Sequence, residues 1–190
     1  MDHLSGTASA RRIVQVEPLD AAAFRAFGEV IDRRSMRPTY AINAGTAQRV
    51  HNLAQVDVST RGGHTAISIV RASPRSLPLQ LERLERHTRG SQAFVPFDTS
   101  RWVVIVAPGR SAPDLDQLRA FVTSGVQGVN YARGTWHHPL IVLDQDAEFL
   151  VVDRVADDGA QDCDVGNQPA FEMWLYAGAE GLEVGMTLAF

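Results

Sequence analysis

The chain has 190 residues, a net charge of −4 at neutral pH and 45% hydrophobic residues. This length suits one domain with a sizeable core, and the hydrophobic share is that of an ordinary globular protein. The acidic balance and the lack of a basic stripe argue against a nucleic-acid partner. No window approaches the ~18 uninterrupted apolar residues of a membrane-spanning helix. We therefore predict a globular protein with neither a nucleic-acid nor a membrane partner.

The single cysteine and the two ends of the chain set further expectations. Cys163 has no second cysteine with which to form an internal disulfide, so a reducing compartment such as the cytoplasm fits. Residues 1–12 lack the apolar segment of a secretion signal and are predicted to be a disordered extension. We expect residues 13–165 to form the domain. Residues 166–190 would be a C-terminal extension that adds strands or packs at an oligomer interface.

Short strands dominate the predicted secondary structure. A first helix is predicted at residues 20–27, where Asp20 can cap the start and Gly28 can end it. A second is predicted at residues 114–122, directly after Pro113. Apolar runs separated by turn residues predict strands at 66–71, 92–97, 102–107, 140–143 and 149–152. Strands about ten residues apart, with only two helices, are typical of a β-sandwich or barrel.

Two segments concentrate titratable side chains between these apolar runs. The first runs from Leu84 to Phe97 and contains Glu85, His87 and Gln92; the second, residues 128–139, ends in the adjacent pair His137 and His138. Because side chains alternate along a strand, Glu85 and His87 should share one face. For the same reason only one of the two adjacent histidines can face a barrel interior, and we expect that to be His137. The two segments are predicted to meet at one site.

The spacing of these residues is similar to the paired motifs of the cupin β-barrels, in which three histidines and a glutamate hold a divalent metal. In this chain Glu85 stands where the first histidine would be, and Gln92 stands where the glutamate would be. Glu85, His87 and His137 would still supply one carboxylate and two imidazoles, a set that suits iron, nickel, manganese or zinc. The neutral amide of Gln92 would be a poor ligand.

Structural interpretations compete with each of these assignments. Glu85 sits among arginines and fits a solvated charge cluster. Tyr131 and Trp136 fit a core as well as a site. Arg71 ends an apolar run, where it either holds a carboxylate or makes a surface salt bridge. Cys163 has no histidine near it in the sequence and is interpreted as inert.

A resemblance covers residues 19–165. The chain resembles the ureidoglycolate lyase family of allantoin catabolism. The segments that carry the resemblance, in order, are Phe27-Gly-Glu-Val-Ile31, Ile42-Asn-Ala-Gly45, His51-Asn-Leu-Ala54, Ile67-Ser-Ile-Val-Arg-Ala72, Leu84-Glu-Arg-His87, Gln92-Ala-Phe-Val-Pro96, Leu118-Arg-Ala-Phe121, Gly128-Val-Asn-Tyr131, Trp136-His-His-Pro139 and Asp162-Cys-Asp-Val165.

The resemblance implies a mainly β fold, a cupin-like (RmlC-like) β-barrel with two short helices, assembled as a homodimer. It also implies cleavage of (S)-ureidoglycolate to glyoxylate and urea, assisted by a divalent metal, nickel or manganese. The chain contains no dinucleotide fingerprint or phosphate loop, so no nucleotide cofactor is expected.

Such a reaction needs a base, an acid or electrostatic stabiliser, and a cation for the substrate's carboxylate. We assign the catalytic roles to His137, His87 and Glu85. The expected substrate-binding residues are Arg71, Arg133, Gln92, Asn130 and Tyr131. Two alternatives stay open: a non-catalytic cupin-like module that binds or senses a small molecule, and an amidohydrolase that releases ammonia from the same substrate.

Overall fold

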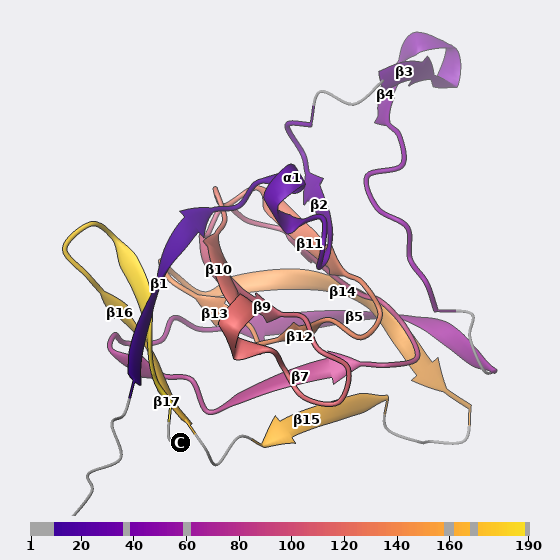
Figure 1. Ribbon diagram of the computed structural model, residues 1–190. Helices are drawn as coiled ribbons and strands as arrows, with labels where there is room; N and C mark the ends of the chain where they lie inside the picture. The colour runs from indigo at the N-terminus through magenta and orange to yellow at the C-terminus, as the bar shows by residue number, and fades with distance from the viewer. Residues whose placement is uncertain (1–9, 36–38, 59–61, 158–161, 168–170, 189–190) are drawn as a thin grey trace, which may run out of the picture.

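Strands make up most of the protein (Figure 1). The computed structural model describes residues 10–35, 39–58, 62–157, 162–167 and 171–188. The elements are β1 (Ala10–Pro18), α1 (Ala21–Phe24), β2 (Gly28–Asp32), β3 (Thr39–Ile42), the 3₁₀ helix η1 (Asn43–Gly45), β4 (Ala47–Val50), β5 (Gly63–Ala72), β6 (Leu79–Gln80), β7 (Arg83–His87), β8 (Gln92–Pro96), β9 (Trp102–Ala107), the 3₁₀ helix η2 (Leu115–Gln117), β10 (Arg119–Val122), β11 (Gln127–Tyr131), β12 (Trp136–His137), β13 (Ile141–Val142), β14 (Ala147–Ala156), β15 (Cys163–Asn167), β16 (Phe171–Ala177) and β17 (Leu182–Leu188).

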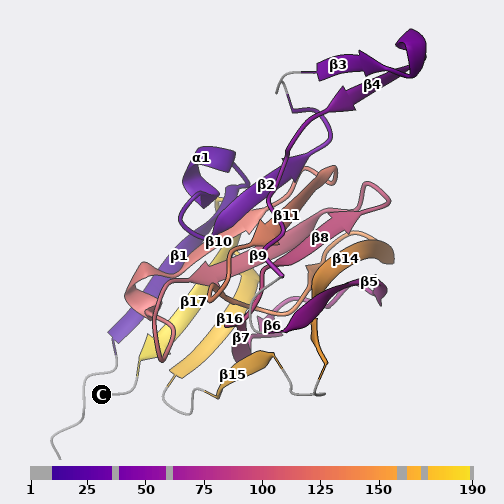
Figure 2. The same ribbon diagram turned by 90° about the vertical axis from the view of Figure 1, so that its right-hand side faces the viewer.

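Two sheets enclose the interior. One has five strands in the order β2-β11-β8-β14-β5, and the other has ten, along the path β15-β7-β12-β9-β10-β1-β17-β16-β6 with β13 beside β9. Figure 2 shows the two sheets facing each other as an open barrel, with β5 and β15 at its free edges. This arrangement confirms the predicted mainly β, cupin-like barrel.

The central strand β9 is buried on both faces and separates two apolar cores. Its side chains Trp102, Val104 and Val106 belong to the core inside the barrel. The alternate side chains, Val103 and Ile105, belong to a second core on the outer face, which the C-terminal strands β16 and β17 cover. This is the alternation expected of a strand with apolar cover on both sides.

The two ends of the described chain pair with each other. Strand β1 lies antiparallel to β17 and parallel to β10. Residues 10–12, expected in the disordered extension, therefore begin a strand; residues 1–9 lie outside the described residues. The C-terminal segment adds strands to the sheet, one of the two outcomes predicted for it. Within the described residues, no helix has the length and apolar character needed to cross a membrane.

All five predicted strands overlap observed ones, in β5, β8, β9, β13 and β14. The first predicted helix is also present, although it is shorter: the Asp20 carboxylate accepts from the backbone N–H groups of Ala22 and Ala23, and α1 ends at Phe24. Strand β2 then starts at Gly28, whose φ is +147°. A Cβ at Gly28 would lie 2.0 Å from the carbonyl oxygen of Asn130, so only glycine fits there.

The second predicted helix, at residues 114–122, is wrong. Only Leu115–Gln117 forms a turn of 3₁₀ helix, and Arg119–Val122 is strand β10. The reason is that β10 is buried on both sides: Ala120 packs in the outer core and Phe121 in the inner core. An apolar run of this kind has no strand-like alternation and cannot be told from a helix by its pattern.

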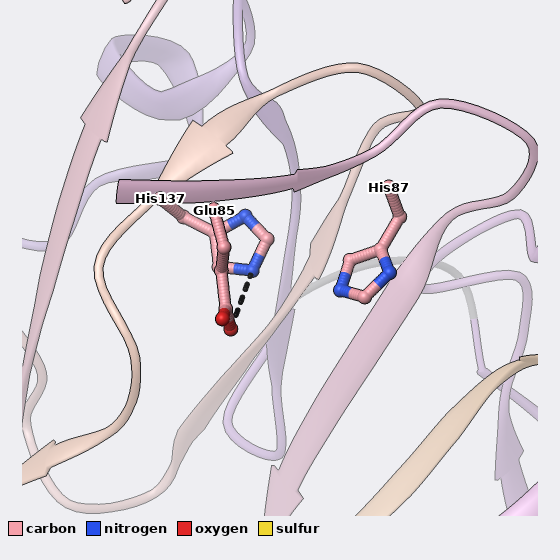
Figure 3. Close-up of side chains that lie close together, drawn as sticks. All are labelled: Glu85, His87 and His137. Atoms are coloured by element: carbon pink, nitrogen blue, oxygen red, sulfur yellow. Dashed lines mark ion pairs between the residues drawn. The ribbon is translucent and has the colours of Figure 1, made fainter. Parts of the chain in front are cut away.

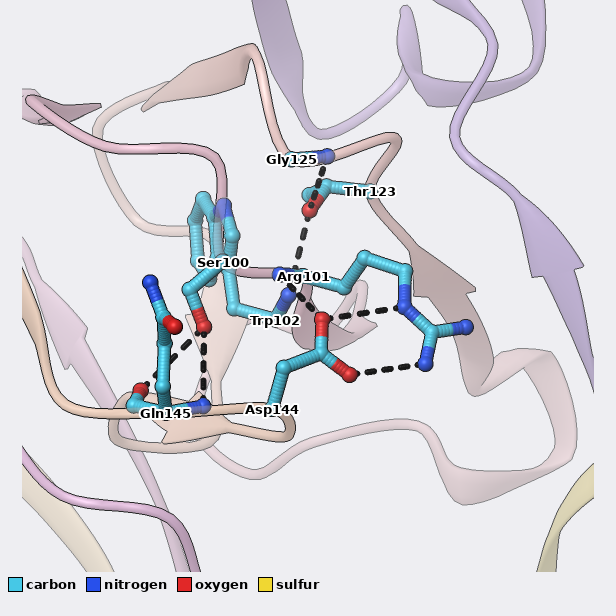
Figure 4. A network of polar contacts seen from close by, with 7 residues as sticks. All are labelled: Ser100, Arg101, Trp102, Thr123, Gly125, Asp144 and Gln145. Atoms are coloured by element: carbon cyan, nitrogen blue, oxygen red, sulfur yellow. Dashed lines mark hydrogen bonds and ion pairs between the residues drawn. The ribbon is translucent and has the colours of Figure 1, made fainter.

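A polar network fastens the residues just before β9 to the turn between β13 and β14 (Figure 4). The Arg101 guanidinium donates two bonds to the Asp144 carboxylate, of 3.1 and 2.7 Å, and its backbone N–H donates a third, of 2.9 Å. Beside it, the Ser100 hydroxyl donates to the carbonyl oxygen of Gln145 at 3.2 Å. The network holds the turn against the base of the central strand.

One segment stands away from the barrel. Strands β3 and β4 and the turn η1 form a hairpin that projects from the body of the molecule in both views (Figures 1 and 2). It lies in the long connection between β2 and β5, and its two strands pair only with each other. We call residues 39–52 the arm.

Candidate active site

Strand pairing places Glu85 and His137 side by side. Strand β12 lies between β7 and β9, with His137 opposite both Glu85 and Val106. His87 follows Glu85 by two residues on β7 and therefore points to the same face. The ligand-type atoms of Glu85, His87 and His137 all lie within 4.8 Å of one another. Figure 3 shows the three side chains gathered on one side of these strands. We call these three residues the cluster.

His137 is held as a neutral imidazole. Its side chain is buried, and its Nδ1 lies 3.0 Å from the carbonyl oxygen of Thr135. Because a carbonyl oxygen can only accept, Nδ1 carries the proton and Nε2 keeps a lone pair. Burial lowers the pKa of His137 to about 3, and the neighbouring His87 and His138 act in the same direction, against the bond to Thr135. The Nε2 atom, which carries this lone pair, lies 3.8 Å from Glu85 Oε1.

Two rings contact that of His137. The Tyr131 ring stacks on it, with ring centroids 4.1 Å apart and planes 10° from parallel. The centroid of the His87 ring lies 5.6 Å from that of His137. Tyr131 is buried in the inner core. That burial, and secondarily the Glu85 carboxylate, raise the pKa of Tyr131, so its phenol stays protonated. The stack fixes the orientation of the His137 ring.

Buried polar atoms in this region lack a hydrogen-bond partner among the described residues. They include Nε2 of His87, Nε2 of His137 and Oε1 of Gln92. The amide nitrogen of Gln92 donates to Asp153 at 3.4 Å. Buried polar atoms are nearly always satisfied in proteins, and leaving one without a partner is costly. Several together suit a site that a bound molecule or ion completes.

The cluster also fits the donor set of a divalent metal. Two imidazoles and one carboxylate are a common set for transition-metal ions, and the Nε2 lone pair of His137 points to the shared space. Gln92 adds no negative charge, in contrast to the glutamate of the cupin motif.

Three of the expected substrate-binding residues make their contacts away from the cluster. Arg71 is on the edge strand β5, where it binds Glu148 at 2.6 Å on the outer face of the sheet. Its partner Glu148 is adjacent to Phe149 on β14, so their side chains point to opposite faces, and Phe149 is in the inner core. Strand alternation thus turns Arg71 away from the barrel interior.

Asn130 and Arg133 line a pocket of about 410 Å³ on the opposite face of β11 from Tyr131. The Asn130 amide nitrogen donates to Glu29 at 2.8 Å. The Arg133 guanidinium lies 3.8 Å from Asp57. Residues adjacent along a strand point to opposite faces, so Asn130 could not join Tyr131 at the cluster.

Two neighbours of His137 also face away. The His138 ring Nδ1 lies 2.7 Å from the carbonyl oxygen of Pro139, and its backbone N–H donates to Ile105 at 3.0 Å. Trp136 belongs to the outer core, beneath the guanidinium of Arg86 at 4.5 Å from the ring centroid. Of the two adjacent histidines, His137 alone faces the cluster, as expected.

Two residues near the cluster were not predicted to belong to the site. Cys163, interpreted as inert, pairs opposite His87 across β15 and β7, and its Sγ lies 3.9 Å from Glu85 Oε2. Partial burial and the Glu85 carboxylate raise the thiol's pKa, so it stays protonated. Asp153 is the partner of Gln92. No local pattern marks either residue, because both reach the site through strand pairing with distant segments.

Comparison with known proteins places the chain in a family. The sequence model described as Ureidoglycolate lyase matches residues 11–172. "Ureidoglycolate lyase" of Burkholderia mallei (strain NCTC 10229) is 49% identical over 148 residues, 77% of this chain and 85% of that protein. The protein of the same name from Escherichia coli (strain SMS-3-5 / SECEC) is 46% identical over 160 residues, 84% of this chain and 97% of that protein.

Among solved structures, RmlC from Streptococcus suis in complex with dTDP-D-xylose aligns with a TM-score of 0.35 and 14% identity, over 79% of this chain and 71% of that one. The family match includes all three residues of the cluster, and the two relatives align with most of the sequence. The chain therefore belongs to the ureidoglycolate lyase family.

Proposed function

We propose that this chain is a carbon–nitrogen lyase that cleaves (S)-ureidoglycolate to glyoxylate and urea, a step in allantoin degradation. Membership of the family and the names of the relatives support the substrate. The observation that carries the proposal is the cluster, in which the buried His137 presents an unprotonated nitrogen beside a second imidazole and a carboxylate.

The substrate has one carbon that bears a hydroxyl, a carboxylate and a urea nitrogen. Cleavage removes the hydroxyl proton, and the O–H electron pair forms the new carbonyl. The C–N bond breaks and its electron pair stays on nitrogen, which gains a proton and leaves as urea. One base, one proton donor and one group that fixes the carboxylate therefore suffice.

We assign the proton-accepting role to Nε2 of His137, because its Nδ1 is already committed to Thr135. Burial lowers the pKa of His137 to about 3, so the imidazole is unprotonated at neutral pH and its Nε2 carries a lone pair that can accept the proton. His87, whose ring lies 5.6 Å from that of His137, is placed to pass a proton to the departing nitrogen. Glu85 stabilises the transient positive charge on His137 from 3.8 Å.

Gln92 and Tyr131 would orient the ureido group. The unpartnered Oε1 of Gln92 can accept from a urea N–H, and the protonated phenol of Tyr131 can donate. Both residues lie opposite each other on β8 and β11, on the face that includes the inner core.

We propose that the same cluster is where a divalent metal, nickel or manganese, would be held by Glu85, His87 and His137. When bound there, such a cation would supply positive charge that polarises substrate oxygens. His137 Nε2 has one lone pair, so it cannot be a metal ligand and the proton acceptor in the same molecule. Metal content therefore decides between these two uses of His137.

The decisive experiment is product analysis. Purified protein is incubated with racemic ureidoglycolate, and glyoxylate, urea and ammonia are assayed with and without a chelator. Glyoxylate and urea in equal amounts, from one enantiomer, are expected. Ammonia in place of urea would identify an amidohydrolase, and no turnover would favour a binding module. We further propose that the protein acts in the cytoplasm as a homodimer.

A further inference from the structure

Asp153 is a carboxylate on the inner face of the barrel that the proposed reaction does not use. It lies two residues after Val151 on β14, and Val151 belongs to the inner core, so strand alternation places Asp153 on the inner face as well. Strand β14 pairs with β8, where Val152 is opposite Ala93. The next pair in this register is Asp153 with Gln92, and the Gln92 amide nitrogen donates to Asp153 Oδ2 at 3.4 Å.

The carboxylate decides which end of the Gln92 amide is left for a bound molecule. A side-chain amide has a donor end and an acceptor end of similar size. A carboxylate only accepts hydrogen bonds, so Asp153 binds the NH2 end and leaves Oε1 for a ligand. Gln92 is 8% exposed, and its Oε1 is buried without a hydrogen-bond partner among the described residues. A buried acceptor in this state favours a ligand that brings an N–H or O–H group.

The neighbours of Gln92 place this acceptor beside the proposed reaction site. Gln92 is directly opposite Tyr131 across β8 and β11. The Tyr131 ring stacks on that of His137, with centroids 4.1 Å apart. Residues directly opposite each other in an antiparallel pair have Cβ atoms about 4.5–5.5 Å apart. A molecule of the size of ureidoglycolate can therefore contact both His137 and the Gln92 amide.

The charges on the inner face distinguish the two ends of such a substrate. Ureidoglycolate has a carboxylate at one end, which only accepts hydrogen bonds, and a terminal NH2 group at the other, which donates them. Gln92 Oε1 attracts the NH2 end and repels the carboxylate. The Asp153 and Glu85 carboxylates act in the same direction, because like charges repel more strongly where water is excluded. A reversed Gln92 amide would instead present its own NH2 group and attract the carboxylate.

We propose that Asp153 is a positioning residue, which holds the Gln92 amide so that Oε1 receives the terminal NH2 group of a ureido acid and the reversed binding orientation is rejected. The inference rests on the proposed function for the class of substrate, and it adds the group that sets the direction in which the substrate binds. Asp153 acts only through Gln92 and does not touch the reacting atoms.

Two ligands that cannot be cleaved test the proposal by binding alone. Ureidoacetate and N-acetylglycine share a shape and a carboxylate, but the second has a methyl group in place of the terminal NH2, and neither has the hydroxyl from which cleavage starts. Isothermal titration calorimetry on the full-length parent should show roughly 10- to 100-fold tighter binding of ureidoacetate, because loss of the NH2 leaves a buried acceptor unpaired. Equal affinities, or no binding of ureidoacetate at millimolar concentration, would overturn the proposal.

Variants of Asp153 show whether the carboxylate is the cause of this preference. Asp153→Asn has nearly the same volume but can donate as well as accept, so the Gln92 amide can turn around and the preference should fall roughly 10-fold. Asp153→Glu keeps a carboxylate and should retain most of the preference, whereas Gln92→Met removes the acceptor and should abolish it. Glu148→Gln, which removes a carboxylate from the outer face of the same strand, should match the parent. A parental preference in Asp153→Asn would overturn the proposal.

Steady-state kinetics separate a positioning role from a catalytic one. In Asp153→Asn the kcat/KM for ureidoglycolate should fall by about the same factor as the ligand preference, and its pH profile should keep the parental shape. Loss of one limb of that profile would mean that Asp153 exchanges a proton with the substrate, and would overturn the proposal. If the parent itself yields no urea, the proposed function fails, whereas the calorimetric preference still decides the role of Asp153.

Discussion

The proton on Nδ1 of His137 is the detail on which the chemistry of the cluster depends. The bond goes to the carbonyl oxygen of Thr135, two positions earlier and just before the short strand β12, so it depends only on local chain geometry. Tyr131 then fixes the plane of the ring. An imidazole held in this way need not reorient when the substrate binds, as is expected of a preorganised site.

Removal of this imidazole should affect turnover far more than binding. His137→Ala is expected to lower kcat about 10²- to 10⁴-fold, the usual contribution of a general base, with KM changed only a few-fold. His138→Ala is the matched control, because it removes the adjacent imidazole, which faces away from the cluster. Steady-state kinetics on both variants test this. Similar losses of kcat in the two would contradict the role given to His137.

Gln92 should decide how tightly the cluster holds a metal. Gln92→Glu introduces a carboxylate beside Asp153, and two neighbouring negative charges favour a bound cation. The variant should take up more nickel or manganese than the parent protein, as measured by elemental analysis after dialysis. Gln92→Met, similar in volume but without charge, should not. Equal uptake by Gln92→Glu and the parent would mean that the site works through acid–base groups alone.

At the residue scale, strand alternation was enough to predict that Glu85 and His87 share a face and that His137 faces inward. The same rule could not be applied to Arg71, because the sequence does not say which face of β5 is the inner one. Cys163 reaches the site only through the pairing of β15 with β7, a contact between segments almost eighty residues apart. Contacts of this kind are invisible to local patterns.

Among the elements, β9 and β10 show why one strand could be predicted and another was mistaken for a helix. The β9 run is short and rich in β-branched residues, which favours a strand whatever its burial. The sequence before β10 contains helix-start signals, and the Asp114 side chain does cap the backbone N–H of Asp116. The cap begins only one 3₁₀ turn, because burial of both faces of β10 outweighs local propensity.

The network at the base of β9 should contribute to stability in a pH-dependent way. Hydrogen bonds from Arg101 hold the pKa of the Asp144 carboxyl below its usual value. A carboxyl with a lowered pKa stabilises the fold fully above its unfolded pKa, near 4, and loses that contribution as the pH falls through the folded value.

Asp144→Asn should therefore lower the free energy of unfolding by roughly 1 kcal/mol at neutral pH, a modest amount because the pair is largely exposed. Urea titrations at several pH values measure the difference between variant and parent. It should be constant from pH 5 to 8 and shrink below pH 4. A difference that grows on acidification would contradict this assignment.

On the scale of the whole molecule, the barrel is only half of the folded structure. The second core, between β9 and the C-terminal hairpin of β16 and β17, buries Met173, Leu175, Val184 and Met186. The sequence offered two roles for this segment, extra strands or an oligomer interface, and the pattern alone could not choose because both bury apolar side chains. Pairing of β17 with β1 and of β16 with β6 assigns it to the sheet.

Adjacent residues of β16 provide a test of this second core. Leu175 is fully buried, whereas its neighbour Trp174 is 37% exposed on the other face. Leu175→Ala should destabilise the protein by about 2–5 kcal/mol, the usual range for a large side chain removed from a core, and Trp174→Ala should cost less. Urea-induced unfolding of both variants makes the comparison. A larger loss for Trp174→Ala would mean that the outer face of the hairpin is the one that is packed.

The pairing of β1 with β17 has a consequence for how the protein forms in a cell. During synthesis its antiparallel neighbour β17 is made after every other strand that the structure describes, whereas β1 is made before all of them. Its other neighbour, β10, appears only after more than half of the chain has been translated. Until β10 is made, β1 lacks both partners, and the edge that pairs with β17 stays open until β17 follows; an open strand edge can pair with other chains. A stall before residue 182 would leave that edge of β1 unpaired for longer, so aggregation of the nascent chain would be expected to rise.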